Sequence, residues 1–136
     1  METEKMYEDW LKERDAYYKV CSIDDLINSA IKQEDGSKNI IIEGEIGKKC
    51  HPVGENGYIF FTIDDVKTGK SVAVKTSLSQ SNNYHIEALS EIGDLVSVAG
   101  SYYPRQNVFY CQYMFNKSLM KDMLNESGDK GDKNGD

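Results

Sequence analysis

Few residues in this chain combine a reactive type with a spacing that would support catalysis or metal binding. Cys50 and His51 are adjacent ligand types, but no second pair follows at a metal-binding spacing, so they indicate a metal site only weakly. Asp64 and Asp65 are paired carboxylates, yet they lie where a strand is expected to end, and no nucleophile and base accompany them. We therefore expect no enzyme, no metal and no cofactor.

Composition narrows the class of protein. The 136 residues carry a formal net charge of −7, and 39% of them are hydrophobic, which suits one domain with a modest core. Residues 1–35 hold five Lys or Arg against ten Asp or Glu, whereas residues 36–116 hold seven against eight. A basic reader of duplex DNA is therefore disfavoured. The near-neutral middle remains compatible with a local positive groove, because salt screens charges beyond about 10 Å.

The sequence shows no membrane span, no signal peptide and no paired cysteines. No stretch approaches the ~20 apolar residues of a membrane span, and the first residues lack the apolar run of a signal peptide. The three cysteines, Cys21, Cys50 and Cys111, lie far apart and form no CxxC pair, so no disulfide framework is predicted. We expect a cytoplasmic protein without membrane contact.

The hydrophobic periodicity changes from helical to strand-like near residue 39. Apolar side chains at i, i+3 and i+4 predict helices over 4–20 and 22–33, and Ser22 is a good N-cap for the second. Alternation with a period of two predicts strands, and one helical pattern interrupts them. The strands are expected over 39–49, 57–65, 71–76, 94–103 and 108–115, with the helix over 84–92.

This order of elements predicts a mostly β fold. Five strands with a helix between strands three and four are typical of the OB-fold, a small Greek-key barrel, here preceded by an N-terminal helical segment. We divide the chain into an N-terminal helical arm (1–35), an OB-fold domain (36–116), and a short helical turn with a tail (117–136). The tail from residue 126 has no apolar side chain, so disorder is expected there.

Three phrases in the middle of the chain resemble the OB-fold nucleic-acid-binding domains of the tRNA-anticodon and single-stranded-DNA-binding type. They match the patterns V-x-G-x-V, G-x-x-x-F-x-x-x-D and G-D-x-V-x-V-x-G. The matching residues are Ile42, Gly44 and Ile46; Gly57, Phe61 and Asp65; and Gly93, Asp94, Val96, Val98 and Gly100. The layout is similar to that of the small single-stranded-DNA-binding proteins encoded by Gram-positive conjugative plasmids.

The resemblance implies that the face of the second and third strands, with its flanking loops, binds nucleic acid. Aromatic rings there would stack on bases, at about 1–3 kcal/mol per base, and Lys and Arg would neutralise phosphates. The positions on this face are Lys48, Lys49, Tyr58, Phe60, Lys70, Lys75, Tyr102, Tyr103, Arg105, Asn107 and Tyr110. In the alternative interpretation, the N-terminal helices cover Tyr58 and Phe60, and the lysines are ordinary solvated charges.

The N-terminal arm carries more apolar surface than an acidic appendage needs for solubility. Met6, Tyr7, Trp10 and Leu11 account for much of it. The arm either packs back on its own barrel and caps an open end, or it docks on a neighbouring protomer. Head-to-tail docking of the second kind forms open chains, which would suit the coating of a long strand.

Together these patterns predict sequence-tolerant binding of single-stranded DNA, by an oligomer that associates through its N-terminal arm. One alternative is an OB-fold adaptor that binds protein and makes no nucleic-acid contact. Another is an RNA-binding module that uses the same face, and binding of duplex DNA is left open. Comparison of DNA and RNA oligomers separates two of these, because the 2′-hydroxyl marks RNA.

Overall fold

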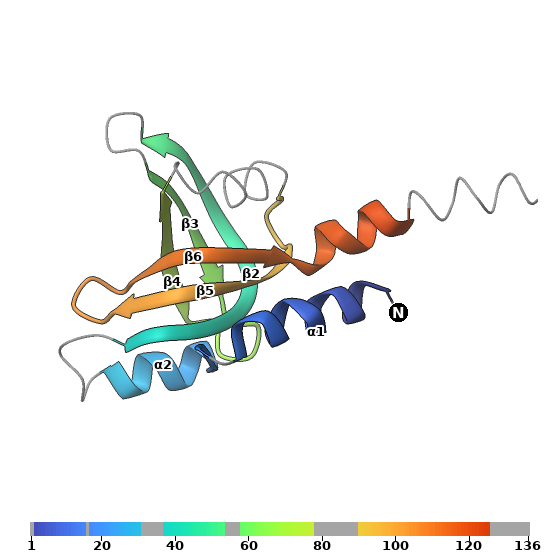
Figure 1. Ribbon diagram of the computed structural model, residues 1–136. Helices are drawn as coiled ribbons and strands as arrows, with labels where there is room; N and C mark the ends of the chain where they lie inside the picture. The colour runs from blue at the N-terminus through green and yellow to red at the C-terminus, as the bar shows by residue number, and fades with distance from the viewer. Residues whose placement is uncertain (1, 16, 31–36, 54–57, 78–89, 126–136) are drawn as a thin grey trace, which may run out of the picture.

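The computed structural model describes residues 2–15, 17–30, 37–53, 58–77 and 90–125, and within these ranges the side chains of 15, 29, 30, 37, 50–53, 58, 59 and 77 are left undescribed. The elements follow one another along the chain as two helices and six strands, followed by a helix over 117–125 (Figure 1). They are α1 (Glu2–Asp15), β1 (Lys19–Val20), α2 (Ile23–Ala30), β2 (Ser37–Val53), β3 (Tyr58–Asp64), β4 (Ser71–Ser77), β5 (Leu95–Tyr103) and β6 (Val108–Asn116).

The strands close into a mixed barrel. Their order is β1-β2-β3-β4-β6-β5, and β5 pairs back onto β2, so that β2 to β6 form a continuous ring. All neighbours in the ring are antiparallel except β4 and β6, which run parallel. This barrel confirms the predicted mostly β OB-fold with an N-terminal helical segment. Within the helix predicted over 84–92, residues 84–89 lie outside the described residues, and 90–92 are not helical.

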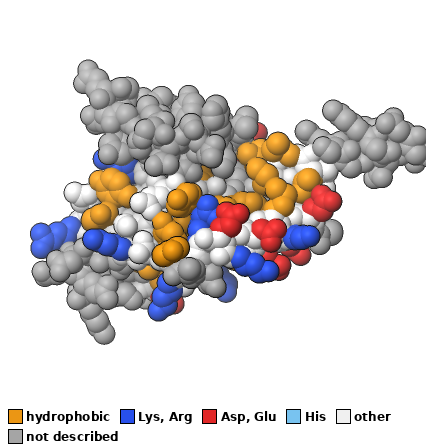
Figure 2. Space-filling view, in the orientation of Figure 1, with side chains coloured by type: hydrophobic (Ala, Val, Ile, Leu, Met, Phe, Trp, Pro, Cys, Tyr) orange, Lys and Arg blue, Asp and Glu red, His pale blue; other side chains and the backbone are white. Residues whose placement is uncertain are grey.

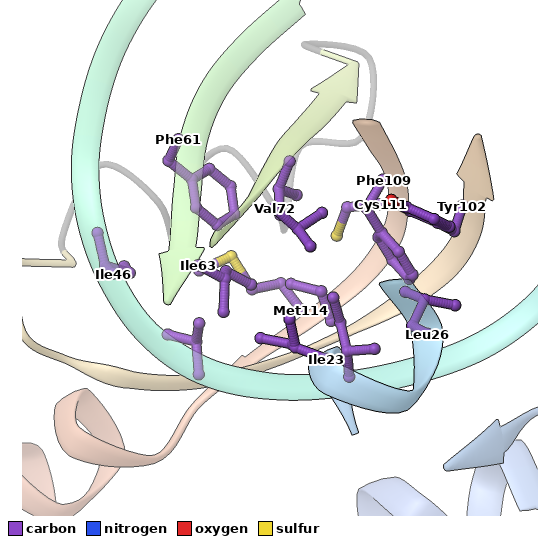
Figure 3. Close-up of a cluster of buried hydrophobic side chains, with 14 residues drawn as sticks. Ile23, Leu26, Ile46, Phe61, Ile63, Val72, Tyr102, Phe109, Cys111 and Met114 are labelled. Carbon is purple, nitrogen blue, oxygen red and sulfur yellow. The ribbon is translucent and has the colours of Figure 1, made fainter. Parts of the chain in front are cut away.

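Alternating side chains of the strands fill the barrel. Phe61 and Ile63 on β3 and Val72 and Val74 on β4 are at most 1% exposed, as the period of two predicts. They meet Val96 and Val98 of β5 and Phe109 and Met114 of β6 in one hydrophobic cluster (Figure 3). The core therefore belongs to all strands of the ring.

The helix α2 closes one end of this barrel. Ile23 and Leu26 are almost fully buried and point into the same cluster as Ile63 and Met114 (Figure 3). The Ser22 hydroxyl accepts the backbone N–H of Asp25 at 3.0 Å, which confirms Ser22 as the N-cap. The division of the chain at residue 35 stays a prediction, but the core already includes two residues from the proposed arm.

Two boundaries differ from the sequence expectation because of strand pairing. The first helix ends at Asp15 rather than at residue 20, since Lys19 and Val20 pair in parallel with Ile40 and Ile41 of β2. The strand β2 runs to Val53, through a segment expected to be a loop, because its last residues pair with β3. Long-range pairing of this kind leaves little local signal in the sequence.

A bulge distorts β6 where it pairs with β5. Ala99 pairs with Tyr113 and Gly100 with Cys111, so Gln112 is an extra residue on β6. A Cβ atom on Gly100 would lie 1.8 Å from the carbonyl oxygen of Tyr110, so only glycine fits there. Because of the bulge, Gln112 and Tyr113 are both exposed.

The helix over 117–125 begins at a buried polar junction. Asn116 is fully buried; its Oδ1 accepts the backbone N–H of Leu119 at 2.8 Å, and its Nδ2 donates to Ser90 Oγ at 2.7 Å and to the Asp94 carboxylate at 3.0 Å. The side-chain cap of Asn116 thus starts this helix, at the place where a short helical turn was expected within 117–136. Among the described residues, no helix is long and apolar enough to cross a membrane. The tail from residue 126 lies outside the described residues.

Candidate nucleic-acid interface

Three side chains on neighbouring strands form a row on the outside of the barrel. Phe60 of β3 pairs with Lys75 of β4, and Lys75 pairs with Tyr110 of β6. The Lys75 ammonium lies 5.3 Å from the centre of each flanking ring. We call Phe60, Lys75 and Tyr110 the central row. Their strand register fixes the order ring, cation, ring.

The row continues to the turn between β5 and β6. Tyr103 and Tyr110 meet edge to face, with ring centres 5.0 Å apart and planes at 83°. Beside them lies a hollow of about 410 Å³, lined by Tyr103, Pro104, Arg105, Gln106 and Tyr110, which we call the hairpin hollow. In Figure 2, the visible side chains toward this end of the molecule are basic or hydrophobic, whereas the acidic side chains lie toward α1, with basic ones among them.

This arrangement suits a single nucleic-acid strand. A ring with an open face can stack on a base of any identity, and a neighbouring ammonium can contact the phosphate between two bases. Lys75 can also retain part of its attraction to the rings, because a cation within about 6 Å of an aromatic face is stabilised. Of the predicted positions, the structure brings together Phe60, Lys75, Tyr103, Arg105 and Tyr110.

Two predicted phosphate-binding lysines are engaged elsewhere. Lys70 Nζ lies 2.7 Å from the Asp24 carboxylate and 3.3 Å from Asn28 Oδ1, so it ties the turn before β4 to α2. Lys49 Nζ donates to the carbonyl oxygen of Ser90 at 2.5 Å. Lys70 and Lys49 therefore lie apart from the central row. Their partners are 46 and 41 residues away in sequence, which is why the sequence did not reveal them.

Tyr102 and Asn107 hold the hairpin together from inside. Tyr102 is only 2% exposed, and its hydroxyl donates to Asn107 Oδ1 at 2.6 Å. Burial raises the pKa of the Tyr102 hydroxyl above its ordinary value. The Asn107 side chain also donates from Nδ2 to the backbone carbonyl oxygen of Ser71 at 3.1 Å. Tyr102 is thus a core residue and is removed from the predicted stacking surface, while Asn107 shapes the turn.

 The φ of Asn107 is 51°, in the left-handed region that asparagine tolerates better than most residues, so the tight turn depends on this side chain and on this backbone conformation together.

Two further predicted positions lie on or beside β3. Lys48 is exposed on β2, and its backbone N–H donates to the hydroxyl of Thr62 on β3 at 2.9 Å. The backbone of Tyr58 pairs with Ser77 at the start of β3, and its side chain is outside the described part of the chain. Lys48 therefore stays a candidate at the border of the face, and the stacking role of Tyr58 stays a prediction.

The sequence did not predict that Pro104 and Gln106 line the hairpin hollow. The only available signal was their position in the expected turn between the last two strands. A turn residue carries no periodicity that would tell whether its side chain faces a neighbouring ring, so the sequence could not place Gln106.

The paired carboxylates have structural partners. Asp64 accepts a hydrogen bond from the Ser71 hydroxyl at 2.5 Å, and Asp65 accepts from the Lys67 N–H and the Thr68 hydroxyl within the β3–β4 turn. Among the described residues, no group of three or more His, Cys, Asp or Glu side chains could hold a metal ion. The side chains of Cys50 and His51 lie outside the described part of the chain.

The helix α1 packs on its own barrel. Tyr7 and Trp10 stack on each other and both contact Phe115 of β6, with ring centres 5.4 and 6.0 Å from that ring. The Arg14 guanidinium lies between Trp10 and Tyr113, 4.4 and 4.3 Å from the ring centres. Two of the four residues predicted to mediate self-association, Tyr7 and Trp10, thus contact their own chain.

The other two candidates for self-association are placed differently. Met6 is 40% exposed on α1. Leu11 lines a hollow of about 290 Å³ between α1 and the start of the barrel, together with Tyr18, Val20 and Ile41. Association through Met6 and Leu11 stays a prediction.

A polar cluster fastens α1 to the barrel and to the helix 117–125. Ser97 Oγ lies 3.0 Å from the Tyr7 hydroxyl and 3.2 Å from the Glu43 carboxylate. Lys117 Nζ lies 2.6 Å from Glu43 and 3.8 Å from the centre of the Tyr7 ring. Burial raises the pKa of the Tyr7 hydroxyl, and Glu43 adds to the rise, while the Ser97 hydrogen bond and Lys117 oppose it.

Comparison with known proteins places this fold in a family. The family model described as "Telomere regulation protein Stn1" matches residues 37–126. A chain in the crystal structure of yeast Stn1 and Ten1 superposes with a TM-score of 0.57 at 14% identity, covering 85% of this chain and 73% of that one. An OBody bound to hen egg-white lysozyme superposes with a TM-score of 0.50 at 12% identity, covering 61% and 81%.

These two superpositions show a shared fold. No curated protein sequence matches the chain. The expected similarity to plasmid-encoded proteins is not shown by any of these comparisons, whereas the family match covers most of the chain, from the start of β2 to the end of the last described helix. The chain belongs to the Stn1 family of telomere regulation proteins.

Proposed function

We propose that this protein binds single-stranded DNA at telomeres through the outer face of β3, β4 and β6. The observation that carries the proposal is the central row, in which the Lys75 ammonium lies 5.3 Å from the rings of both Phe60 and Tyr110. A duplex hides the faces of its bases, so stacking rings favour a single strand. The family description supplies the telomere context.

The charge distribution supports a local rather than a global attraction for the strand. The whole chain has a net charge of −7, yet the described side chains of the row and the hollow include Lys75 and Arg105 and none of them is acidic. The first turn of α1 contains Glu2 and Glu4, and the acidic side chains visible in Figure 2 lie toward that helix. Because salt at 0.1 M screens charges beyond about 10 Å, the cations next to a bound strand matter more than the net charge of the chain.

We infer that a second protein accompanies the chain in its function. The yeast Stn1 structure was solved together with Ten1, so a Ten1-like partner is the natural candidate. A telomere role would place the protein in the nucleus rather than in the cytoplasm expected from its sequence. We keep the prediction that the protein acts as a binding module and not as an enzyme.

Fluorescence anisotropy with a labelled dT oligonucleotide tests the proposal directly. With contacts from Lys48, Lys75 and Arg105, the slope of log K against log salt should be about −2, from −0.7 per neutralised phosphate. Parallel titrations with duplex DNA and with RNA of the same length are the controls. Equal affinity for the duplex, or no salt dependence, would contradict the proposal.

Self-association is a separate part of the proposal, and Met6 offers the sharper test. Because Tyr7 and Trp10 pack on their own barrel, removing them would disturb the fold as well as any contact between protomers. Met6→Asp changes an exposed side chain only. If the arm docks on a neighbouring protomer, light scattering should show a smaller average mass for this variant. An unchanged mass would argue against docking through Met6.

A protein-binding module without nucleic-acid contact is the second candidate. The acidic α1 and the exposed apolar side chains of Tyr113 and Met123, 44% and 49% exposed, favour it. The anisotropy titration separates the two candidates, because an adaptor of this kind would bind no oligonucleotide even at low salt.

A further inference from the structure

The hairpin hollow has a different geometry from the central row. Tyr103 and Tyr110 form two of its walls, with their ring planes at 83° and their centres 5.0 Å apart. A base that stacks on one of these rings meets the edge of the other, so a stack cannot continue through this corner. The hollow is therefore shaped to receive one base that has left the stack of its neighbours.

The remaining walls carry hydrogen-bonding groups. Arg105 and Gln106 line the hollow beside the rigid ring of Pro104. An arginine guanidinium pairs with O6 and N7 of guanine, and a glutamine amide pairs with N6 and N7 of adenine. Both pairings use the N7 acceptor, which purines have on this edge and pyrimidines lack. The volume of about 410 Å³ leaves room for the two fused rings of a purine.

We propose that the hairpin hollow binds one purine base of the bound strand and reads its N7 edge through Arg105 and Gln106. This inference rests on the proposed binding of single-stranded DNA and adds a selective position to it. The central row accepts any base, since its contacts are ring faces and an ammonium. One position in the strand then prefers a purine, while its neighbours remain tolerant of sequence.

Oligonucleotides of dT with one substituted position test this inference. A single guanine or adenine, moved along the oligonucleotide, should raise affinity about tenfold at one favoured position, the size expected for one base-edge pairing. The 7-deaza analogue of the same purine keeps both rings but lacks N7. This analogue should lose most of the gain in affinity, because the N7 acceptor is removed. Its rings still offer the same stacking area, so a loss cannot be attributed to stacking.

Variants of the protein connect the effect to the hollow. Gln106→Ala and Arg105→Ala should each reduce the ratio of purine to thymine affinity at the favoured position. Lys75→Ala, in the central row, should weaken both oligonucleotides and leave that ratio unchanged. Circular dichroism confirms that each variant is folded.

The outcomes separate this inference from the proposed function. Binding of uniform dT without any gain from a purine would overturn the hollow as a selective site and leave the proposed function standing. A gain that survives the 7-deaza substitution would also overturn it, because ring size alone would then explain the preference. Failure of every oligonucleotide to bind would overturn both.

Discussion

Lys75 lies 5.3 Å from the ring of Tyr110, which is its register partner on the neighbouring strand β6. The two strands run parallel at this point, the only parallel pairing in the ring of strands β2 to β6 that the structure describes. The same register places Phe60 on the other side of Lys75. Closure of the barrel therefore creates the central row, because β4 and β6 are joined only when the ring is complete.

Loss of the row's ammonium should weaken binding to every sequence alike. Lys75→Ala removes one phosphate contact, so the salt slope measured by anisotropy should become less steep by about 0.7. The matched control is Lys70→Ala, a lysine just before the same strand whose ammonium already pairs with Asp24. A loss as large for Lys70→Ala as for Lys75→Ala would show that general charge, rather than the row, drives binding.

Removal of a ring should cost stacking energy without unfolding the barrel. Tyr110→Ala is expected to reduce the binding free energy by about 1–3 kcal/mol, and Tyr110→Phe should retain most of it. For comparison, Tyr102→Phe breaks the buried hydrogen bond to Asn107. It should lower the free energy of unfolding by about 1 kcal/mol in urea titrations and leave the affinity unchanged. Unchanged stability with weaker binding of the Tyr102→Phe variant would instead indicate that Tyr102 contacts the nucleic acid.

Docking of α1 should contribute to stability. Trp10→Ala removes contacts with Tyr7, Phe115 and Arg14, so the free energy of unfolding should fall by roughly 1–3 kcal/mol, less than for a fully buried tryptophan. Tyr17→Ala is the control, because Tyr17 is 74% exposed. Equal urea midpoints for Trp10→Ala and the unmodified chain would mean that α1 is not held on the barrel in solution.

The bulge in β6 predicts a strong effect of a single methyl group. In Gly100→Ala the new Cβ would meet the carbonyl oxygen of Tyr110, so the β5–β6 pairing must shift. We expect a loss of about 1–3 kcal/mol in unfolding free energy, the usual range for overpacking. Ser101→Ala, at the next position of β5, should have little effect. A neutral Gly100→Ala would show that the bulge can relax.

Stability should also depend on alkaline pH through Tyr7. Burial raises the pKa of its hydroxyl in the folded state above the unfolded value of about 10. The folded state then keeps the proton longer, so this contribution is fully present below the unfolded pKa and is lost as pH rises through the folded pKa. Urea unfolding between pH 8 and 11 should show a decline that Tyr7→Phe makes shallower. Identical pH profiles for Tyr7→Phe and the unmodified chain would show that Tyr7 does not cause the decline.

Local periodicity made most of the barrel predictable. Phe61 and Ile63, like Val72 and Val74, occupy every second position of their strands, and burial follows that period of two. The pattern fails on β5, where residues 96–100 are all buried. There both faces of the strand are covered, and alternation no longer distinguishes inside from outside. Tyr102 was expected on the binding face because the resemblance assigns the flanking loop to it, but it has the same inward phase as Val96 and Val98 and lies in the core.

The candidate site was predictable in residue type but not in pairing. The row Phe60, Lys75 and Tyr110 follows from alternation, because all three point away from the core side of their strands. The hydrogen-bond partners of Lys70 and Lys49 are Asp24 and Ser90, which the fold brings from distant segments. A single sequence contains no local signal for such partners.

Closure of the barrel end by α2 has a consequence for truncated forms of the protein. The family match begins at residue 37, yet Ile23 and Leu26 fill space inside the ring of strands. A protease cut or an alternative start site just before β2 would remove Ile23 and Leu26 and expose the end of the hydrophobic core to water. We therefore expect the smallest stable fragment to begin upstream of residue 37, where the family match starts.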